Sequence, residues 1–335
     1  EWQALSDTEL DKERVEENPE GFLRETSGWF ESSYLWSVVS MTSYTRAKIS
    51  AQQHAQTLLY CQAVDVSEQI LRRDTDIYDR MLSVPNVGHT SRLPAWVLLH
   101  TGMRVRLTTQ VLPPWAVQDA TGTVMEIDIC AHDRRRLDSS GDPHPPAEMC
   151  LTELPMGVYV KLDKCNHEFL PPLVCQKHQG AGFCKECCDC RALEGWVLIE
   201  PLTRQWTFKD PVTDATLNVK RTQLPLMPEA ACALYSLQGA TCDPGLVAHF
   251  AMPKRADHDI KWLIVYVLLS RVRSLSRLRS IGLTTKIRQI IEGGPPAMLA
   301  ENFEKVFRQK ITHTKKTAQA AVSALGWTWP SSRSS

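Results

Sequence analysis

The sequence predicts an α/β protein that is interrupted by a β-rich insertion and ends in a long helix. Strand and helix candidates alternate in residues 34–92 and again in residues 226–292, which is typical of an α/β layer. Residues 93–225 instead carry short strand candidates separated by Pro and Gly turn signals. Residues 296–325 repeat apolar side chains at the period of a helix. The remaining parts are an acidic lead-in at 1–33 and a C-terminal helix and tail at 293–335.

The first part of the α/β layer follows a polar lead-in. Residues 1–31 hold ten acidic and three basic side chains, and we expect them to be partly helical or disordered. After them, apolar β-branched runs predict strands and the more polar stretches predict helices. The expected elements are a strand from Leu35 to Met41, a helix over 45–56, a strand over 57–64 and a helix over 73–83.

The insertion is predicted to be a small β-barrel-like domain. Pro113-Pro114 and Gly141-Asp142-Pro143 are turn signals between its short strands. A loop at 131–150 is polar enough that we expect it to be disordered. The strand candidates are 96–100, 103–111, 121–130, 157–162, 195–201, 205–209 and 215–219.

The second part of the layer is expected to begin at Pro228, which can open a helix over 229–237. Residues 245–251 predict a buried strand, and one more strand is expected at 278–283. The C-terminal helix carries its apolar side chains on one face, which we expect to pack against the body of the protein. This stripe consists of Leu299, Phe303, Val306, Phe307 and Ile311.

The composition limits the partners of the chain. Lysine plus arginine equals aspartate plus glutamate at 38 each, but residues 254–288 hold nine basic and two acidic side chains, which would suit a polyanion. The longest apolar run has eight residues, short of the roughly 20 that span a bilayer, so we expect no membrane partner. Eleven cysteines, an odd number, indicate metal binding or free thiols in a reducing intracellular compartment, such as the nucleus.

A continuous apolar run, Trp262 to Leu269, ends in Ser270-Arg271, with more arginines following up to Arg279. We expect such a run to be buried, so that Arg271 is held where a core element reaches the surface. An arginine fixed in this way offers a planar fork of donors that suits phosphate. The alternative is a core helix with an ordinary solvated basic end.

Two segments resemble motifs of superfamily-one DNA helicases of the RecD and petite-integration-frequency type. Ala233 to Asp243 (ALYSLQGATCD) resembles motif V, and Tyr266 to Ser274 (YVLLSRVRS) resembles motif VI. His100 to Val124 is similar to the stretch that opens the accessory domain of that family. Residues 38–65 are similar to a degenerate motif IV, with Arg46 as its arginine. The matching positions in motifs V and VI are Gln238, Gly239, Thr241, Asp243, Tyr266, Val267, Leu269, Ser270 and Arg271.

The resemblance implies an incomplete RecA-like second helicase domain with an inserted SH3-like domain. In this family ATP and Mg²⁺ bind between two RecA-like domains, and an arginine of the second domain stabilises charge on the γ-phosphate. Arg271 matches that catalytic arginine, and Gln238 and Gly239 match nucleotide-side positions. Contacts to single-stranded or forked DNA are implied for Thr241, Arg273 and Arg46.

The chain departs from the family in two ways. Tyr235, Ser236 and Leu237 stand where the family has His-Lys-Ser, which removes a basic contact. The sequence also lacks a G-x-x-x-x-G-K-[ST] loop and a Walker B strand, so the first RecA-like domain is missing from it. We therefore expect the C-terminal part of a helicase, inactive without its ATP-binding domain. The alternatives are a non-catalytic nucleic-acid-binding remnant and a zinc-stabilised interaction module.

Six of the eleven cysteines are crowded between Cys165 and Cys190. Short Cys/His spacings of this kind suit tetrahedral Zn²⁺, which would stabilise a long loop. The alternative is a loop with unligated thiols. The preferred ligands are Cys175, His178, Cys187 and Cys190; Cys165 and His167 could replace the middle pair, and Cys184 or Cys188 could also be a ligand.

Four tryptophans lie in the β-rich insertion. One or two of them could stack on nucleic-acid bases, as aromatic residues do on single-strand-binding barrels. Core packing is the alternative for each. They are Trp96, Trp115, Trp196 and Trp206.

Overall fold

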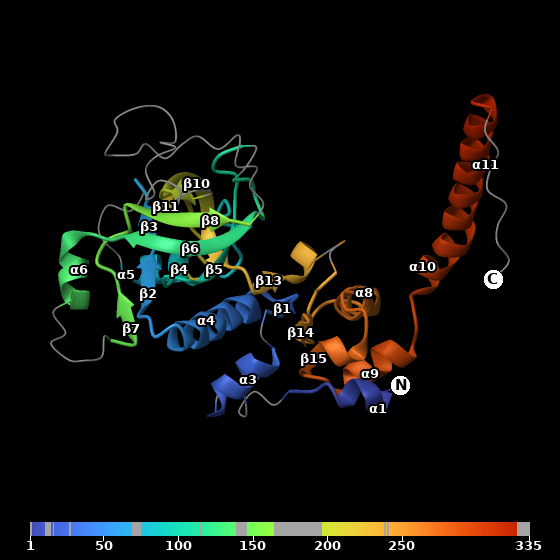
Figure 1. The fold of residues 1–335 in the computed structure, drawn as a ribbon, viewed down its shortest axis with the longest axis horizontal. Coiled ribbons are helices and arrows are strands. Elements are labelled where there is room, and N and C mark those ends of the chain that lie inside the picture. The colour runs from blue at the N-terminus through green and yellow to red at the C-terminus, as the bar shows by residue number, and fades with distance from the viewer. Residues whose placement is uncertain are drawn as a thin grey trace, which may run out of the picture.

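The structure, a computed structural model, confirms a mixed α/β protein with a parallel sheet. In Figure 1 the β-rich part lies on one side, the parallel sheet lies next to it, and the C-terminal helix projects from the far end. The structure describes residues 2–10, 15, 17–26, 28–68, 75–113, 116–138, 146–163, 196–237, 239 and 241–326.

A four-stranded sheet, parallel throughout, forms the centre of the α/β layer. Its order is β13 (Ala231–Ala233), β1 (Phe30–Ser33), β14 (Leu246–His249) and β15 (Leu278–Ile281). Every residue of β14 is buried, as expected for a parallel strand that is covered on both faces. The predicted strands at 245–251 and 278–283 are therefore confirmed.

Two helices cover opposite faces of this sheet. Leu246 packs in one cluster with Leu268 of α8 (His258–Leu269), whereas its neighbour Val247 packs with Ile49 of α4 (Trp36–Gln53). Successive side chains of a strand point to opposite faces, so α8 and α4 lie on different sides. The chain leaves β1 through α4 and leaves β14 through α8. A smaller helix, α9 (Thr285–Glu292), packs beside α8.

The acidic lead-in is partly helical, with α1 (Trp2–Ser6) and α3 (Pro19–Glu25). Between them the backbone pairs with the edge strand β15. The Ser280 N–H donates to the Thr8 carbonyl at 2.8 Å, and the Leu10 N–H donates to the Ser280 carbonyl at 2.7 Å. The two hydroxyl oxygens of Thr8 and Ser280 also lie 2.8 Å apart. Thr8 to Leu10 therefore extend the parallel sheet by a short fifth segment.

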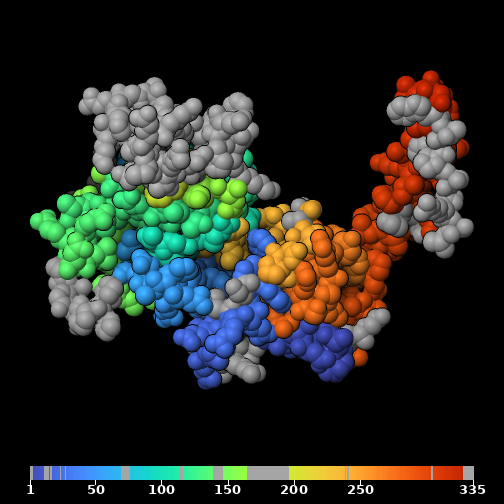
Figure 2. Space-filling model, viewed as in Figure 1, coloured from blue at the N-terminus to red at the C-terminus, as the bar shows by residue number. Residues whose placement is uncertain are grey.

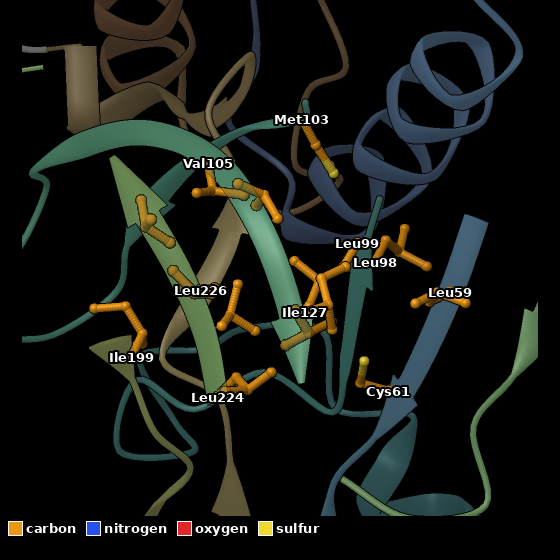
Figure 3. Packing of buried hydrophobic residues seen from close by; sticks show 14 of the residues in the cluster. Leu59, Cys61, Leu98, Leu99, Met103, Val105, Ile127, Ile199, Leu224 and Leu226 are labelled. Atoms are coloured by element: carbon orange, nitrogen blue, oxygen red, sulfur yellow. The ribbon is translucent and has the colours of Figure 1, made fainter. Parts of the chain in front are cut away.

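The β-rich part consists of three sheets. Antiparallel pairing makes the five-stranded sheet, and its strands alternate buried and more exposed side chains. Side chains of this sheet and of β2 and β4 form the largest apolar core, part of which is shown in Figure 3. The five-stranded sheet has the order β12 (Leu226–Pro228), β5 (Arg104–Leu107), β6 (Thr121–Asp128), β8 (Gly157–Leu162) and β9 (Trp196–Ile199). One three-stranded sheet has the order β10 (Leu202–Lys209), β11 (Thr216–Gln223) and β3 (Val64–Val66). The other has the order β4 (Trp96–Leu99), β2 (Leu58–Gln62) and β7 (Glu148–Cys150).

Strands β2 and β3 precede residue 93, yet they pair with strands of the β-rich part and not with β1. A buried ion pair strengthens this connection. Both oxygens of the Asp65 carboxylate in β3 accept hydrogen bonds from Arg221 of β11, at 2.8 and 2.6 Å. The Arg221 guanidinium also donates to the Met81 carbonyl of α5 (Thr75–Leu82) and lies over the Trp206 ring. Residues 58–66 are thus fixed to the β-rich part.

Three expectations were wrong. The segment from Leu35 to Met41 is the first part of the 18-residue helix α4 and not a strand. Residues 229–237 do not form a helix: they form β13 and then a 3₁₀ turn at Leu234–Leu237, because Ala231–Ala233 are fully buried beside β1. The loop at 131–150 contains α6 (Ala131–Asp138) and β7, where the buried Asp133 carboxylate accepts hydrogen bonds from Thr152.

The C-terminal helix does not pack against the body. It consists of α10 (Ala297–Asn302), a π-helical turn at Phe303–Phe307 and α11 (Arg308–Ala324), and neither α10 nor α11 buries a residue. Figures 1 and 2 show it projecting away from the rest of the molecule. The predicted packing of its apolar stripe is therefore wrong. In the described part of the chain, none of the helices is long and apolar enough to cross a membrane.

Candidate functional site

Helix α8 positions Arg271, the residue that motif VI singles out. The helix begins after Asp257, whose carboxylate accepts the Ile260 N–H at 2.8 Å. It ends at Leu269, and Ser270 caps it. Arg271 therefore follows the helix directly, at the point where the chain turns towards β15.

The Arg271 side chain is half-buried and held by several hydrogen bonds. Its Nε donates to the Val267 carbonyl at 3.1 Å, one turn back along α8. One terminal nitrogen, Nη1, donates to the Leu237 carbonyl at 3.2 Å, and Nη2 donates to Ser270 Oγ at 2.8 Å. The guanidinium is thus fixed by its own helix and by the segment that resembles motif V.

The two motif segments also meet through other contacts. The Cys242 N–H donates to the Arg271 carbonyl at 2.8 Å, and Arg277, three residues beyond the second segment, pairs with Asp243 at 2.6 Å. The structure therefore places the segment that resembles motif V against the segment that resembles motif VI. The Arg277–Asp243 pair and the carbonyl partners of Arg271 could not be found from the sequence, because backbone acceptors leave no signal in it.

The apolar run before Arg271 is only half-buried, contrary to expectation. Ile264, Val265 and Leu268 are buried against the sheet. On the opposite side of the helix, Leu263 is 40% exposed and Tyr266 is 52% exposed. Helix α8 therefore carries an apolar outer face beside Arg271. The Trp262 and Tyr266 rings stack on this helix with centroids 5.2 Å apart.

Gly239 and Thr241, two further positions that resemble motif V, lie between the 3₁₀ turn at Leu234–Leu237 and β14. Gly239 has φ +78°, a conformation that favours glycine, and a Cβ added there would meet nothing within 4 Å. Thr241 is exposed, and the next residue, Cys242, is buried. Burial raises the pKa of the Cys242 thiol to about 11, so this thiol is neutral at pH 7. Gln238 lies outside the described residues.

Arg46 lies away from Arg271, in a buried network between α4 and the sheet. Its Nε donates to Glu31 Oε2 at 2.6 Å, and Glu31 Oε1 lies 2.5 Å from His249 Nε2. The Arg46 guanidinium also lies over the Phe22 ring, 4.4 Å from its centroid. Burial alone would raise the pKa of Glu31, but the His249 hydrogen bond and the Arg46 charge outweigh it and hold that pKa below its usual range. A side chain that is 6% exposed is poorly placed for a nucleic-acid contact.

The predicted basic run from Lys254 to Arg288 divides into two groups. Arg277, Arg279 and Arg288 each pair with a carboxylate of the chain. Lys254, Arg255, Arg273 and Lys286 are exposed.

The predicted zinc ligands cannot be placed. Cys165, His167, Cys175, His178, Cys187 and Cys190 all lie outside the described residues. Within the described ranges, no group of three or more His, Cys, Asp or Glu side chains could hold a metal ion. The structure therefore gives zinc no support.

The tryptophans of the insertion differ in exposure. Trp206 is buried beside Phe208, which favours core packing. Trp96 is 41% exposed and lines an apolar pocket of about 540 Å³ together with Trp36 and Tyr60. Trp115 lies outside the described residues.

Comparisons with known proteins found similarity in structure only. No protein-family model matches the chain, and no curated protein matches it. Pif1 helicase from Candida albicans is 18% identical, with 87% of this chain and 56% of that chain covered and a TM-score of 0.40. Pif1 helicase from Bacteroides in complex with ADP-AlF3 and ssDNA is 14% identical, with 84% and 45% covered and a TM-score of 0.44. The chain thus spans about half the length of these proteins.

Proposed function

We propose that this chain is the C-terminal part of an ATP-dependent DNA helicase, and that Arg271 is its arginine finger. The convergence of the two motif segments on Arg271 carries the proposal. Its guanidinium is held by the Leu237 and Val267 carbonyls, so it would lose little conformational entropy on meeting an anion. A preorganised cation of this kind can stabilise charge that develops on a γ-phosphate.

The outer face of α8 supports a partner domain beside Arg271. Leu263 and Tyr266 are exposed apolar side chains on the helix that ends at this arginine. An ATP-binding domain that covered them would bring its bound nucleotide close to the guanidinium. That domain would also supply the phosphate-binding loop and the Mg²⁺ carboxylate, which the printed sequence lacks. ATP would provide the phosphoryl group, and Gln238 and Gly239 would lie on the nucleotide side of the motif V turn.

Single-stranded or forked DNA is the proposed polymer substrate. Thr241 and Arg273 are exposed on the two motif segments, so both could contact a phosphate backbone. Lys254 and Lys286 are exposed and could extend this path. Arg46 is assigned to holding α4 on the sheet, because its charge is already paired with Glu31.

The arginine finger is tested in a helicase that joins this chain to an ATP-binding domain. Arg271→Ala is expected to lower DNA-stimulated ATP hydrolysis by roughly 10³-fold, the usual effect of losing such an arginine. Lys316→Ala, on the projecting helix, serves as the control and should leave the rate unchanged. If Arg271→Ala hydrolysed ATP at the unaltered rate, the assignment would be wrong.

DNA binding is tested on this chain alone. Anisotropy of a labelled oligo(dT) strand should show affinity that falls with salt, and Arg273→Ala should reduce the slope of log K against log salt by about 1.

The runner-up function is a nucleic-acid-binding remnant without ATPase activity. Leu237 favours it, because this residue offers only its carbonyl to Arg271 where the helicase family has a polar side chain. Salt-dependent DNA binding by this chain, combined with no DNA-stimulated ATP hydrolysis when the chain is joined to an ATP-binding domain, would select this alternative. A zinc-stabilised interaction module would instead show bound zinc by elemental analysis and no DNA binding.

A further inference from the structure

The projecting C-terminal helix carries a seam of exposed and partly exposed side chains from Phe307 to Leu325. Phe307 is 48% exposed, Ile311 is 51% exposed and Leu325 is 65% exposed. Together with Thr314, Ala318 and Ala321, these residues are spaced alternately by four and three positions, as in the a and d positions of a heptad repeat. The seam residues, in order, are Phe307, Ile311, Thr314, Ala318, Ala321 and Leu325.

Three of the six positions that flank this seam are basic. With Phe307, Thr314 and Ala321 at d, the e positions are Arg308, Lys315 and Val322, and the g positions are Lys310, Thr317 and Ala324. Helix α11 contains no Asp or Glu among its 17 residues. In two-stranded coiled coils the e and g side chains select the partner by charge. A partner helix with acidic e and g positions would therefore match this seam.

Self-association is disfavoured by the same charges. A parallel pair of copies would place Lys310 of one copy against Lys315 of the other. An antiparallel pair that overlaps the whole seam would place Lys315 of one copy near Lys315 of the other. Like charges at these positions are destabilising.

Two other partners fit less well. A nucleic acid could neutralise the lysines, but it would leave Phe307 and Ile311 exposed to water. An anionic membrane would gain little from Thr314, Ala318 and Ala321, which bury little apolar area. Small side chains at these positions instead let another helix approach closely.

We propose that the helix at 307–325 is a docking site for an acidic amphipathic helix of a partner protein. The two helices would form a short antiparallel or parallel coiled coil. The length of the seam is about 27 Å at 1.5 Å per residue. This inference does not depend on the proposed helicase function.

The experiment uses the full chain and two labelled 21-residue helical peptides. Both carry Leu at a and d, and they differ only in having Glu or Lys at every e and g position. Fluorescence anisotropy should show at least tenfold tighter binding of the Glu peptide. Ile311→Asp should weaken that binding at least tenfold, because it places a charge in the seam.

A charge exchange provides the specific control. Lys310→Glu/Lys315→Glu should reverse the preference between the two peptides. Lys305→Glu/Lys316→Glu changes the same net charge away from the seam and should keep the preference for the Glu peptide. Equal effects of the two double variants would overturn the proposal. So would binding to duplex DNA or phosphatidylglycerol vesicles with no measurable binding of the Glu peptide.

Discussion

Replacing Glu31 by glutamine is expected to destabilise the fold strongly, because it leaves a buried arginine without its counter-charge. The Arg46 side chain is 7% exposed, and its Nε lies 2.6 Å from the Glu31 carboxylate. Removing one partner of a buried ion pair costs about 3–5 kcal/mol. The Phe22 ring over Arg46 would offset only about 1–2 kcal/mol of this, as a desolvated cation–π contact. We therefore expect the free energy of unfolding to fall by about 3 kcal/mol.

Urea denaturation at pH 7, followed by circular dichroism, measures this loss. Asp214→Asn removes the exposed Lys209–Asp214 pair and serves as the control, with an expected change below about 1 kcal/mol. The double change Glu31→Gln/Arg46→Met removes both charges and should recover much of the stability. If Glu31→Gln cost less than about 1 kcal/mol, the account of a buried charge pair would be refuted.

The same ion pair predicts a dependence on pH. The pKa of Glu31 is lower in the folded state than in the unfolded chain, where a glutamate titrates near pH 4.3. Its contribution is therefore fully present above that pH and is lost as the pH falls through the folded-state pKa. Unfolding free energies measured between pH 7 and pH 3 should converge for the unaltered protein and Glu31→Gln. Curves that stayed parallel over this range would contradict the sign of the shift.

Three further outcomes follow from burial and backbone geometry. Leu58→Ala, at a fully buried core position, should lower the unfolding free energy by about 2–5 kcal/mol in the same urea assay. Iodoacetamide at pH 7.5 should modify the exposed Cys150 and leave Cys242 intact, because burial keeps the Cys242 thiol protonated. Mass spectrometry after labelling of the native protein distinguishes the two sites. Gly239→Ala should cost about 1–2 kcal/mol because of its positive φ, and a change of zero would mean that the turn adopts another conformation.

The secondary structure of a segment could be predicted where a single local sequence pattern determines it. Residues 245–251 form a short apolar run, and it is a buried strand of the parallel sheet. The segment from Leu35 to Met41 carries a similar β-branched run, but it continues into the polar residues of α4, and the full length of the helix decides its structure. The prediction of a helix over residues 229–237 was wrong for another reason. Alanines favour a helix, yet Ala231–Ala233 are small enough to fit as a buried strand beside β1.

The sequence identified candidate site residues by their type and their resemblance to a motif, but it did not identify the partners of those residues. Arg271 and the motif V turn were found through resemblance, and their proximity is observed in the structure. Glu31 and His249 form a short contact but lie 218 residues apart, and neither belongs to a motif. The sequence therefore could not predict the partners of Arg46, although the burial of Arg46 determines what this residue can bind. Long-range pairing of single polar residues leaves no periodic pattern in a sequence.

The pairing of Thr8 to Leu10 with β15 has a consequence for association between chains. Without it, β15 would present a row of unpaired backbone groups, which invites edge-to-edge association with another chain. The lead-in covers this edge at Ser280 with two backbone hydrogen bonds, and the Glu9 carboxylate accepts a further one from the Leu283 N–H. The acidic lead-in thus protects the edge of the sheet from pairing with another chain. A protein shortened by its first ten residues should aggregate at concentrations at which the whole chain remains dispersed.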